Sequence, residues 1–301
     1  MSRASWAIAL RARSVAAAVG AALVLAACAQ GGAPARDGSA SAAATSIEVA
    51  TYNLRLNLAQ DGPNAWPHRR DAVKALIRYH GWDLFGTQEG LIDQIRDLES
   101  MSEYARVGVG RDDGAERGEH SAIFFRRDRF ELLGHGDFWL SPTPEVPSLG
   151  WDATCCKRLA TWARLRERRS GKHLLVLSAH FDHEGRTAQL ESARLVLRKL
   201  KELSRGELVI CLGDFNSTPE TPQMRAMSAE LRDARLASES APYGPQGTFN
   251  DFVFDAPMDR RIDYVFVGPG IRVLRYAVLT DSVRGRYPSD HHPVLTRLAL
   301  D

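Results

Sequence analysis

Two side chains that could bind a metal ion or a phosphate group follow one apolar segment of the sequence. Residues 208–212 are apolar and partly β-branched, a pattern that predicts a strand buried on both faces. Gly213 ends this run, and Asp214 and Asn216, two positions apart, should leave the strand on the same side. A carboxylate and an amide would then lie side by side at the edge of the sheet, where open α/β folds bind their ligands. Because core packing does not require an acid there, a functional site is favoured over a solvated strand end.

The same pattern recurs at the ends of other predicted strands. Seven segments end in Asn, Asp, Glu or His, and their polar residues are Asn53, Glu89, Glu119, His180 with Asp182 and His183, Asp214 with Asn216, Asp263, and Asp290 with His291. Solvation alone does not demand this composition. Carboxylate and amide oxygens suit a hard divalent cation such as Mg²⁺ or Mn²⁺, and a His–Asp pair can take a proton from water. Together these groups predict metal-dependent hydrolysis of a phosphate ester by water.

The hydrophobic pattern predicts the elements that position these residues. Strands are expected at residues 47–53, 82–89, 119–125, 130–140, 158–169, 172–181, 208–212, 261–267, 271–279 and 293–298, and helices at 66–80, 91–98 and 187–203. A hairpin turn is expected at Ser170-Gly171, a long functional loop at residues 141–157, and a helix start at residues 217–220. Strands mixed with outer helices predict an α/β sandwich of two packed sheets.

Five motifs of the sequence resemble those of a known superfamily. They are Thr51-Tyr52-Asn53, Gln88-Glu89, Gly213-Asp214-Phe215-Asn216, Arg261-Ile262-Asp263-Tyr264 and Ser289-Asp290-His291-His292-Pro293. In this order they look like the signature blocks of the endonuclease/exonuclease/phosphatase superfamily, which includes deoxyribonuclease I, exonuclease III, inositol polyphosphate phosphatases and bacterial sphingomyelinases. The resemblance covers residues 47 to 298. It implies a deoxyribonuclease I-like fold, a four-layered α/β sandwich of two packed mixed β-sheets flanked by helices.

The resemblance also implies a metal site and a general base. Glu89 would be the principal ligand of Mg²⁺ or Mn²⁺, with Asn53 beside it and Asp290 completing the shell. His291 would activate the attacking water, and Asp263 would orient His291. The chain is therefore expected to be a Mg²⁺-dependent phosphoric ester hydrolase.

Four further residues take their expected roles from the same resemblance. Asp214 would act near the attacking water or as a second metal ligand, and Asn216 would hold a phosphate oxygen. Glu119 resembles the position that pairs with a histidine in deoxyribonuclease I, and His180 would be that histidine. In this pairing His180 would contact the scissile phosphate or act as general acid to the leaving group.

Two features depart from the nuclease pattern and leave the substrate open. The segment His180-Phe181-Asp182-His183 is richer in polar groups than a single histidine, and the blocks at residues 138–141 and 158–162 resemble a secreted bacterial branch. Substrate contacts are expected from Asp182, His183, Arg158 and Arg286, although a structural corner at residues 182–183 or a solvated loop around Arg286 is as compatible with the sequence. A small phosphodiester, a nucleotide or a phosphorylated metabolite is favoured as substrate. The alternatives are a nuclease, a phospholipase C or sphingomyelinase, and a catalytically silent surface-binding lipoprotein.

The N-terminus has the pattern of a lipoprotein signal. Three arginines precede the apolar segment 15–27, and Leu25-Ala26-Ala27-Cys28 resembles the bacterial lipoprotein processing box. We expect a signal peptide at residues 1–27, lipid attachment at Cys28, a Gly-, Ala- and Ser-rich tether over residues 28–46, and the catalytic domain at residues 47–301. The enzyme would then be anchored by its lipid to a membrane of the bacterial cell envelope.

Composition limits the class of partner. Removing residues 1–27 removes three Arg and no acid, which changes the formal charge from +2 to −1. A chain so close to neutral lacks the global basic field of a tight, sequence-blind nucleic-acid binder, so a nucleic-acid partner is possible but not indicated. A monomer that binds a phosphate-ester substrate is expected.

The cysteines predict no disulfide scaffold. Cys211 belongs to the predicted buried strand, where it would act as a small hydrophobe. Cys155 and Cys156 are neighbours, and a bond between adjacent cysteines is strained and uncommon. The odd number of cysteines after Cys28 also argues against a disulfide scaffold, and the role of Cys155 and Cys156 stays open.

Overall fold

Residues 45–301 are described by the computed structural model, and their strands form two six-stranded sheets. The first sheet, in the order β11-β12-β1-β2-β4-β3, contains β1 (Thr45–Asn53), β2 (Leu84–Gln88), β3 (Tyr104–Val107), β4 (Ile123–Arg126), β11 (Ile271–Val278) and β12 (Val294–Leu300). The second, in the order β5-β6-β7-β8-β10-β9, contains β5 (Phe130–Trp139), β6 (Leu159–Glu167), β7 (His173–His180), β8 (Leu208–Asp214), β9 (Arg232–Asp233) and β10 (Asp263–Val267). The helices are η1 (Ala59–Asn64), α1 (Trp66–Tyr79), α2 (Ile92–Glu99), α3 (Arg186–Leu203), α4 (Pro222–Glu230) and α5 (Ala234–Ala237).

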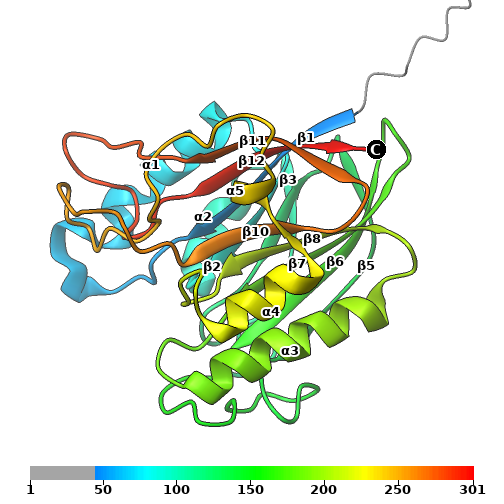
Figure 1. Cartoon of the computed structure of the whole chain (residues 1–301). Coiled ribbons are helices and arrows are strands. Elements are labelled where there is room, and N and C mark those ends of the chain that lie inside the picture. The colour runs from blue at the N-terminus through cyan, green and yellow to red at the C-terminus, as the bar shows by residue number, and fades with distance from the viewer. Residues whose placement is uncertain (1–44) are drawn as a thin grey trace, which may run out of the picture. The chain divides into compact units, whose positions relative to one another are not determined.

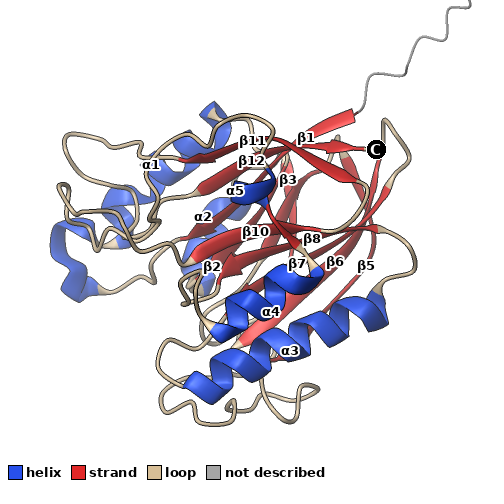
Figure 2. Ribbon diagram, viewed as in Figure 1, coloured by secondary structure: helices blue, strands red, loops and turns tan. Residues whose placement is uncertain are grey.

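Three apolar clusters stack these elements into four layers (Figures 1 and 2). The central cluster joins the inner faces of the two sheets, with Val49 on one and Leu212 on the other. A second cluster packs α1 and α2 on the outer face of the first sheet, and a third packs α3 and α4 on the outer face of the second. The predicted four-layered α/β sandwich is therefore confirmed.

Strand pairing brings the polar strand ends to one edge of the domain. β1 and β2 are parallel and pair Asn53 with Gln88, while β7 and β8 are parallel and pair His180 with Asp214. β10 runs antiparallel to β8 and begins opposite its end, where it pairs Asp263 with Asp214. Both sheets thus deliver their polar termini to the same region.

The long predicted elements are confirmed, and the short ones account for the differences. The helix start expected at residues 217–220 is wrong, because α4 begins at Pro222 after Thr221. The earlier segment serves the core instead: Ser217 accepts a hydrogen bond from the buried amide of Gln223 (2.6 Å) and, through its carbonyl, from the hydroxyl of Tyr264 (2.8 Å).

Cys155 and Cys156, whose role the sequence left open, form a disulfide although a bond between adjacent cysteines is uncommon. Both residues lie in the irregular segment between β5 and β6. The backbone distortion that a bond between neighbours demands therefore breaks no helical or ladder hydrogen bond. Cys211 is free and fully buried, as predicted.

Alkylation should distinguish the two kinds of cysteine. In denaturant, iodoacetamide should label Cys211 at once but should label the peptide containing Cys155 and Cys156 only after reduction. Peptide mass mapping with and without reductant measures both. Complete labelling of that peptide without reductant would show that the bond does not form.

The predicted signal peptide, Cys28 and nearly all of the tether lie outside the described residues. From residue 45 onward, no helix combines the length and the hydropathy needed to cross a bilayer.

Candidate active site

The polar strand ends meet around a cavity of about 430 Å³. Nine residues predicted from the sequence line it: Glu89, Glu119, Arg158, His180, His183, Asp214, Asn216, Asp290 and His291. Asn53 and Asp263, also predicted, are buried behind Glu89 and His291, to which they are hydrogen-bonded. The structure thus brings together residues that are separated by up to about 240 positions in the chain.

Unusual backbone conformations aim several of these side chains. Glu89 (φ 62°) and Asn216 (φ 45°) both adopt the left-handed region that non-glycine residues rarely occupy. Gly213 has φ 148°, and a Cβ atom there would lie 1.9 Å from the carbonyl oxygen of Ala179. Only glycine fits this position, so Gly213 allows β8 to continue beside β7 as far as Asp214. Such backbone outliers at a polar cavity favour a functional role for the residues they aim.

His291 and Asp263 form a buried pair. His291 Nδ1 donates to Asp263 Oδ2 at 2.9 Å, which leaves Nε2 directed toward Asp214, 3.8 Å from its Oδ2 atom. Thr248 fixes Asp263 by accepting a hydrogen bond from its backbone N–H. Burial lowers the pKa of His291, but the carboxylates of Asp263, Asp214 and Asp290 together outweigh burial, Asp263 most of all, and raise this pKa well above the ordinary value. The imidazole is therefore a strong base whose Nε2 atom faces the cavity.

The Asp263 carboxylate should control the pH profile of the enzyme. In Asp263→Asn the imidazole loses the charge that raises its pKa, so it should lose its proton at lower pH. The acid limb of kcat/KM, on which activity rises as His291 becomes neutral, should then move to lower pH while the maximum rate falls. A pH–rate profile of both proteins measures this shift. An unchanged acid limb would remove His291 as the titrating base.

Glu89, Asp214 and Asp290 form an acidic cluster organised by Asn53. The amide of Asn53 donates to Glu89 Oε1 and to Asp214 Oδ2, both at 2.9 Å, and its oxygen accepts from the backbone N–H of Arg55 at 2.9 Å. Burial raises the pKa of Asp214 to about 7 and that of Asp290 to about 6. The chain therefore concentrates desolvated carboxylates where a bound cation would stabilise their charged form.

This donor set fits Mg²⁺ or Mn²⁺. Glu89 and Asp290 offer carboxylate oxygens, and ligand atoms of Glu89, His180 and Asp214 lie within 4.8 Å of one another. Hard divalent cations prefer such oxygen-rich sites. In this arrangement Asn53 orients the carboxylates through its amide nitrogen, whereas the resemblance implied that it stands beside Glu89 as a ligand.

Arginine and histidine form the opposite wall. Arg158, which is buried, donates to His183 Nδ1 at 2.7 Å and lies 3.0 Å from His180 Nε2. Burial, followed by the charge of Arg158, lowers the pKa of His180 well below its ordinary value. Neutral His180 suits contact with a phosphate oxygen better than proton donation.

Glu119 and His180 are paired loosely, as the resemblance implied. Glu119 Oε2 lies 3.6 Å from His180 Nδ1, but it accepts a closer hydrogen bond (2.6 Å) from Arg111. Burial nevertheless raises the pKa of Glu119 to about 7. Through its hydrogen bond, the Glu119 carboxyl holds Arg111 at the cavity, next to His180.

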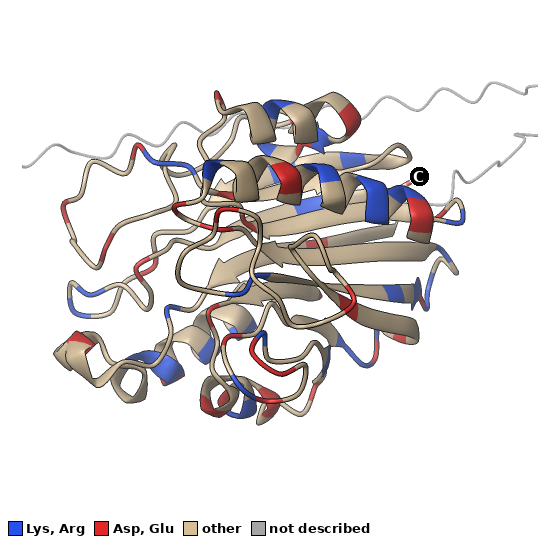
Figure 3. Ribbon diagram, turned by 90° about the horizontal axis from the view of Figure 1, so that it is seen from below, with Lys and Arg blue, Asp and Glu red and all other residues tan. Residues whose placement is uncertain are grey.

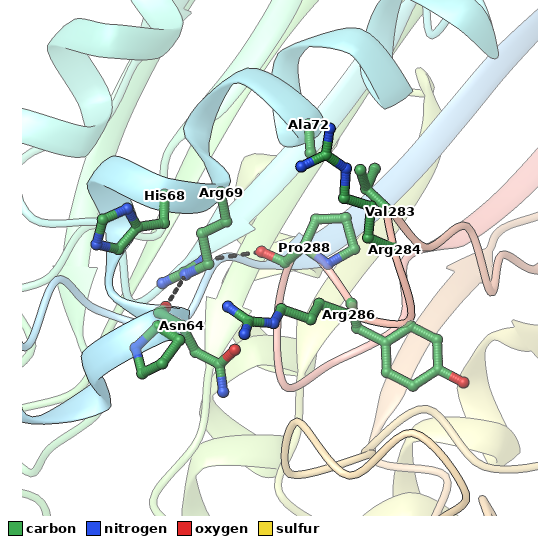
Figure 4. A pocket seen from close by; sticks show the side chains of 10 residues that line it. Asn64, His68, Arg69, Ala72, Val283, Arg284, Arg286 and Pro288 are labelled. Atoms are coloured by element: carbon green, nitrogen blue, oxygen red, sulfur yellow. Dashed lines mark hydrogen bonds between the residues drawn. The ribbon is translucent and has the colours of Figure 1, made fainter.

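Two of the proposed substrate contacts lie away from the cavity. Asp182 is buried behind Arg158, with its Oδ2 atom 3.6 Å from Arg158 Nε, and its Oδ1 atom accepts from the backbone N–H groups of Glu184 and Gly185. Arg286 lies in a different cavity (Figure 4). By contrast, His183 and Arg158 line the catalytic cavity itself.

Several lining residues were not predicted as site residues. They are Arg55, Leu56, Arg111, Cys156, Phe249, Asp251, Arg260 and Ile262. Most come from loops, where neither hydrophobic periodicity nor a motif marks them. For Arg111 the sequence contained an indication of a functional site, because this residue lies in a polar, glycine-rich loop. Phe249 contacts His291 edge to face, with ring centroids 5.1 Å apart.

Comparisons with known proteins find a matching family model and similar solved structures. The sequence matches a family model described as Endonuclease/Exonuclease/phosphatase family over residues 50–291. The crystal structure of an endonuclease/exonuclease/phosphatase family protein from Bacteroides thetaiotaomicron is 41% identical, with a TM-score of 0.82 over 86% of this chain and 99% of that one. A mannosyl-6-phosphatase from Bacteroides thetaiotaomicron is also 41% identical, with a TM-score of 0.80 over 84% of this chain and 99% of that one.

One curated relative also matches. It is an uncharacterised protein of Acanthamoeba polyphaga mimivirus, 25% identical over 169 residues, which are 50% of this chain and 59% of that protein. The chain therefore spans about three fifths of the curated relative that it matches.

Proposed function

Since this chain belongs to the endonuclease/exonuclease/phosphatase family, we propose that it is a phosphatase that needs a divalent cation and hydrolyses the phosphate monoester of a small, sugar-like molecule. The observation that carries the proposal is the cavity itself, which places a buried His–Asp base opposite a wall of arginines. The similarity to a mannosyl-6-phosphatase supports the sugar-like leaving group.

The arginines favour a monoester over a diester. Arg55, Arg111, Arg158 and Arg260 line the cavity. A phosphate monoester carries a second negative charge that a diester lacks, and guanidinium groups bind phosphate oxygens two at a time. The cavity volume also falls in the usual range for small-molecule sites.

The distribution of charged residues gives little support to a nuclease. In the view of Figure 3, positions with Lys or Arg and positions with Asp or Glu are interspersed over the helices and loops, and no continuous basic stripe crosses the ribbon. Long nucleic acids bind mainly through such stripes. A nuclease or a phospholipase therefore remains a second choice.

The residues can be assigned to steps of water attack. His291 Nε2 would take the proton of the attacking water while Asp263 stabilises the imidazolium that forms. Asn216, His180 and Arg158 would donate to the phosphoryl oxygens as their charge grows. Bound at Glu89 and Asp290, Mg²⁺ would supply charge neutralisation at the phosphoryl group.

A substrate panel tests the proposal. Hydrolysis should be measured with Mg²⁺, Mn²⁺ or EDTA, and each substrate needs its own product assay. These are inorganic phosphate from mannose 6-phosphate, p-nitrophenol from p-nitrophenyl phosphate and bis-p-nitrophenyl phosphate, phosphocholine from sphingomyelin, and nicked circles from plasmid DNA. We expect hydrolysis of the two monoesters that EDTA abolishes, at least about 100-fold faster than that of the diesters. Preference for a diester would favour the nuclease or phospholipase alternative, and a folded but inactive protein would favour a binding lipoprotein.

A further inference from the structure

A second, larger cavity lies beside the catalytic one. It measures about 510 Å³ and is formed by η1, the first turns of α1 and the loop that precedes β12 (Figure 4). No residue lines both cavities. Pro288 lines the second cavity and Asp290 lines the catalytic one, so the short segment between them forms part of a common wall.

The lining of this second cavity is cationic. Among its ten lining residues are Arg69, Arg284, Arg286 and His68, and none is acidic. Within the described residues, Arg284 and Arg286 have no carboxylate partner within 4 Å, as is also true of other exposed arginines such as Arg198. Two guanidinium groups therefore face a cavity with no protein anion to neutralise them.

Arg69 has a structural role in this wall. It is buried and donates to the backbone carbonyls of Asn64, Leu54, Arg55 and Pro288. These bonds join the end of β1 to the loop that carries Asp290. Because its donors are satisfied, Arg69 supplies positive potential and a fixed frame, and Arg284, Arg286, His68 and Asn64 are left to contact a ligand.

The backbone conformation at Arg284 is unfavourable for a residue with a long side chain. Val283 and Arg286 exchange backbone hydrogen bonds of 2.9 and 3.1 Å, and the two residues between them, Arg284 (φ 53°) and Gly285 (φ 74°), are both left-handed. This is the tight turn in which asparagine or glycine is the usual first central residue. A long side chain is disfavoured there, so its presence at the rim of a cationic cavity points to use.

We propose that this second cavity binds a tetrahedral oxyanion, a phosphate or sulfate group, in the space lined by Arg284 and Arg286, with His68 and Asn64 as further donors. Guanidinium groups recognise such anions by paired hydrogen bonds. The anion has two sources: a free ion, or a second anionic group of a molecule bound by the enzyme. The proposal is independent of the function proposed above, because it concerns binding at other residues.

The stoichiometry of phosphate binding tests the proposed anion site. Inorganic phosphate should be titrated calorimetrically into the full chain in the presence of Mg²⁺, for the wild type, for R284Q/R286Q and for R198Q/R225Q. The last variant removes two exposed arginines, on α3 and α4, that also lack a carboxylate partner among the described residues. We expect R284Q/R286Q to bind one phosphate fewer than the other two proteins, or to bind it at least about tenfold more weakly.

Kinetics identify the source of the anion. If KM for fructose 1,6-bisphosphate rises in R284Q/R286Q while KM for mannose 6-phosphate does not, the anion is a second group of the same molecule. If neither KM changes and one phosphate site is lost, the anion is free. Equal stoichiometry and affinity in all three proteins would overturn the proposal, whether or not the enzyme hydrolyses any of the substrates.

Discussion

Replacing His291 should lower kcat by about two to four orders of magnitude, with a much smaller change in KM. We propose the imidazole as the base because Asp263 holds Nδ1 at 2.9 Å and leaves Nε2 free to take a proton. In the proposed mechanism, substrate binding depends on the arginines and the acidic cluster of the cavity, which the substitution leaves in place. Steady-state kinetics on the best monoester found in the substrate panel measures the effect.

The choice of substitution decides whether this result is interpretable. His291→Ala leaves the buried Asp263 carboxylate without its partner, a change that costs about 3–5 kcal/mol in comparable pairs and could unfold the protein. His291→Gln keeps a donor toward Asp263 but cannot act as a base at neutral pH. His135→Ala, at an exposed position on β5, is the matched control and should retain wild-type rates. A loss below tenfold in a folded His291→Gln would exclude His291 as the base.

The sheets could be predicted because their strands are long and strongly apolar. Residues 210–212 and 174–177 are buried throughout, so hydrophobicity alone marks them as central strands. β9 has two residues and α5 has four. Such short elements cannot show the hydrophobic alternation of a strand or the hydrophobic periodicity of a helix. The predicted start of α4 was wrong for a different reason. Ser217 has tertiary hydrogen-bond partners that outweigh its local preference to begin a helix.

The site could be predicted where chemistry and strand ends coincide. Asp214 and Asp263 are both predictable, since each adjoins an apolar strand and parallel or antiparallel pairing then brings them together. Arg111 and Phe249 come from loops whose path depends on tertiary contacts, and no local pattern assigns them to the cavity. The disulfide could not be predicted, for the same reason. Whether an irregular loop tolerates a bond between neighbouring cysteines is set by the surroundings of the loop.

Replacing Glu89 should separate metal binding from folding. Glu89 reaches the cavity only through its left-handed backbone, and its two oxygens accept from Asn53 and from the backbone N–H of Leu56. Glu89→Gln preserves the shape but removes the charge that a divalent cation needs. We expect Mg²⁺ to bind at least about 100-fold more weakly and activity at 1 mM Mg²⁺ to fall by about as much. Titration of Mn²⁺ by calorimetry, beside activity against Mg²⁺ concentration, measures both.

A partial recovery of Glu89→Gln at high Mg²⁺ would carry the most information. If the substitution weakens only the affinity for the cation, raising Mg²⁺ should restore kcat, and the carboxylate acts as a ligand. If saturation by Mg²⁺ leaves kcat low, the charge of Glu89 also shapes the reaction, for instance through Asn53 and its shared contact with Asp214. Glu202→Gln, on the exposed face of α3, should change neither quantity. Full activity of Glu89→Gln at micromolar Mg²⁺ would place the metal elsewhere, and the acidic cluster would then have to be explained by the arginines around it.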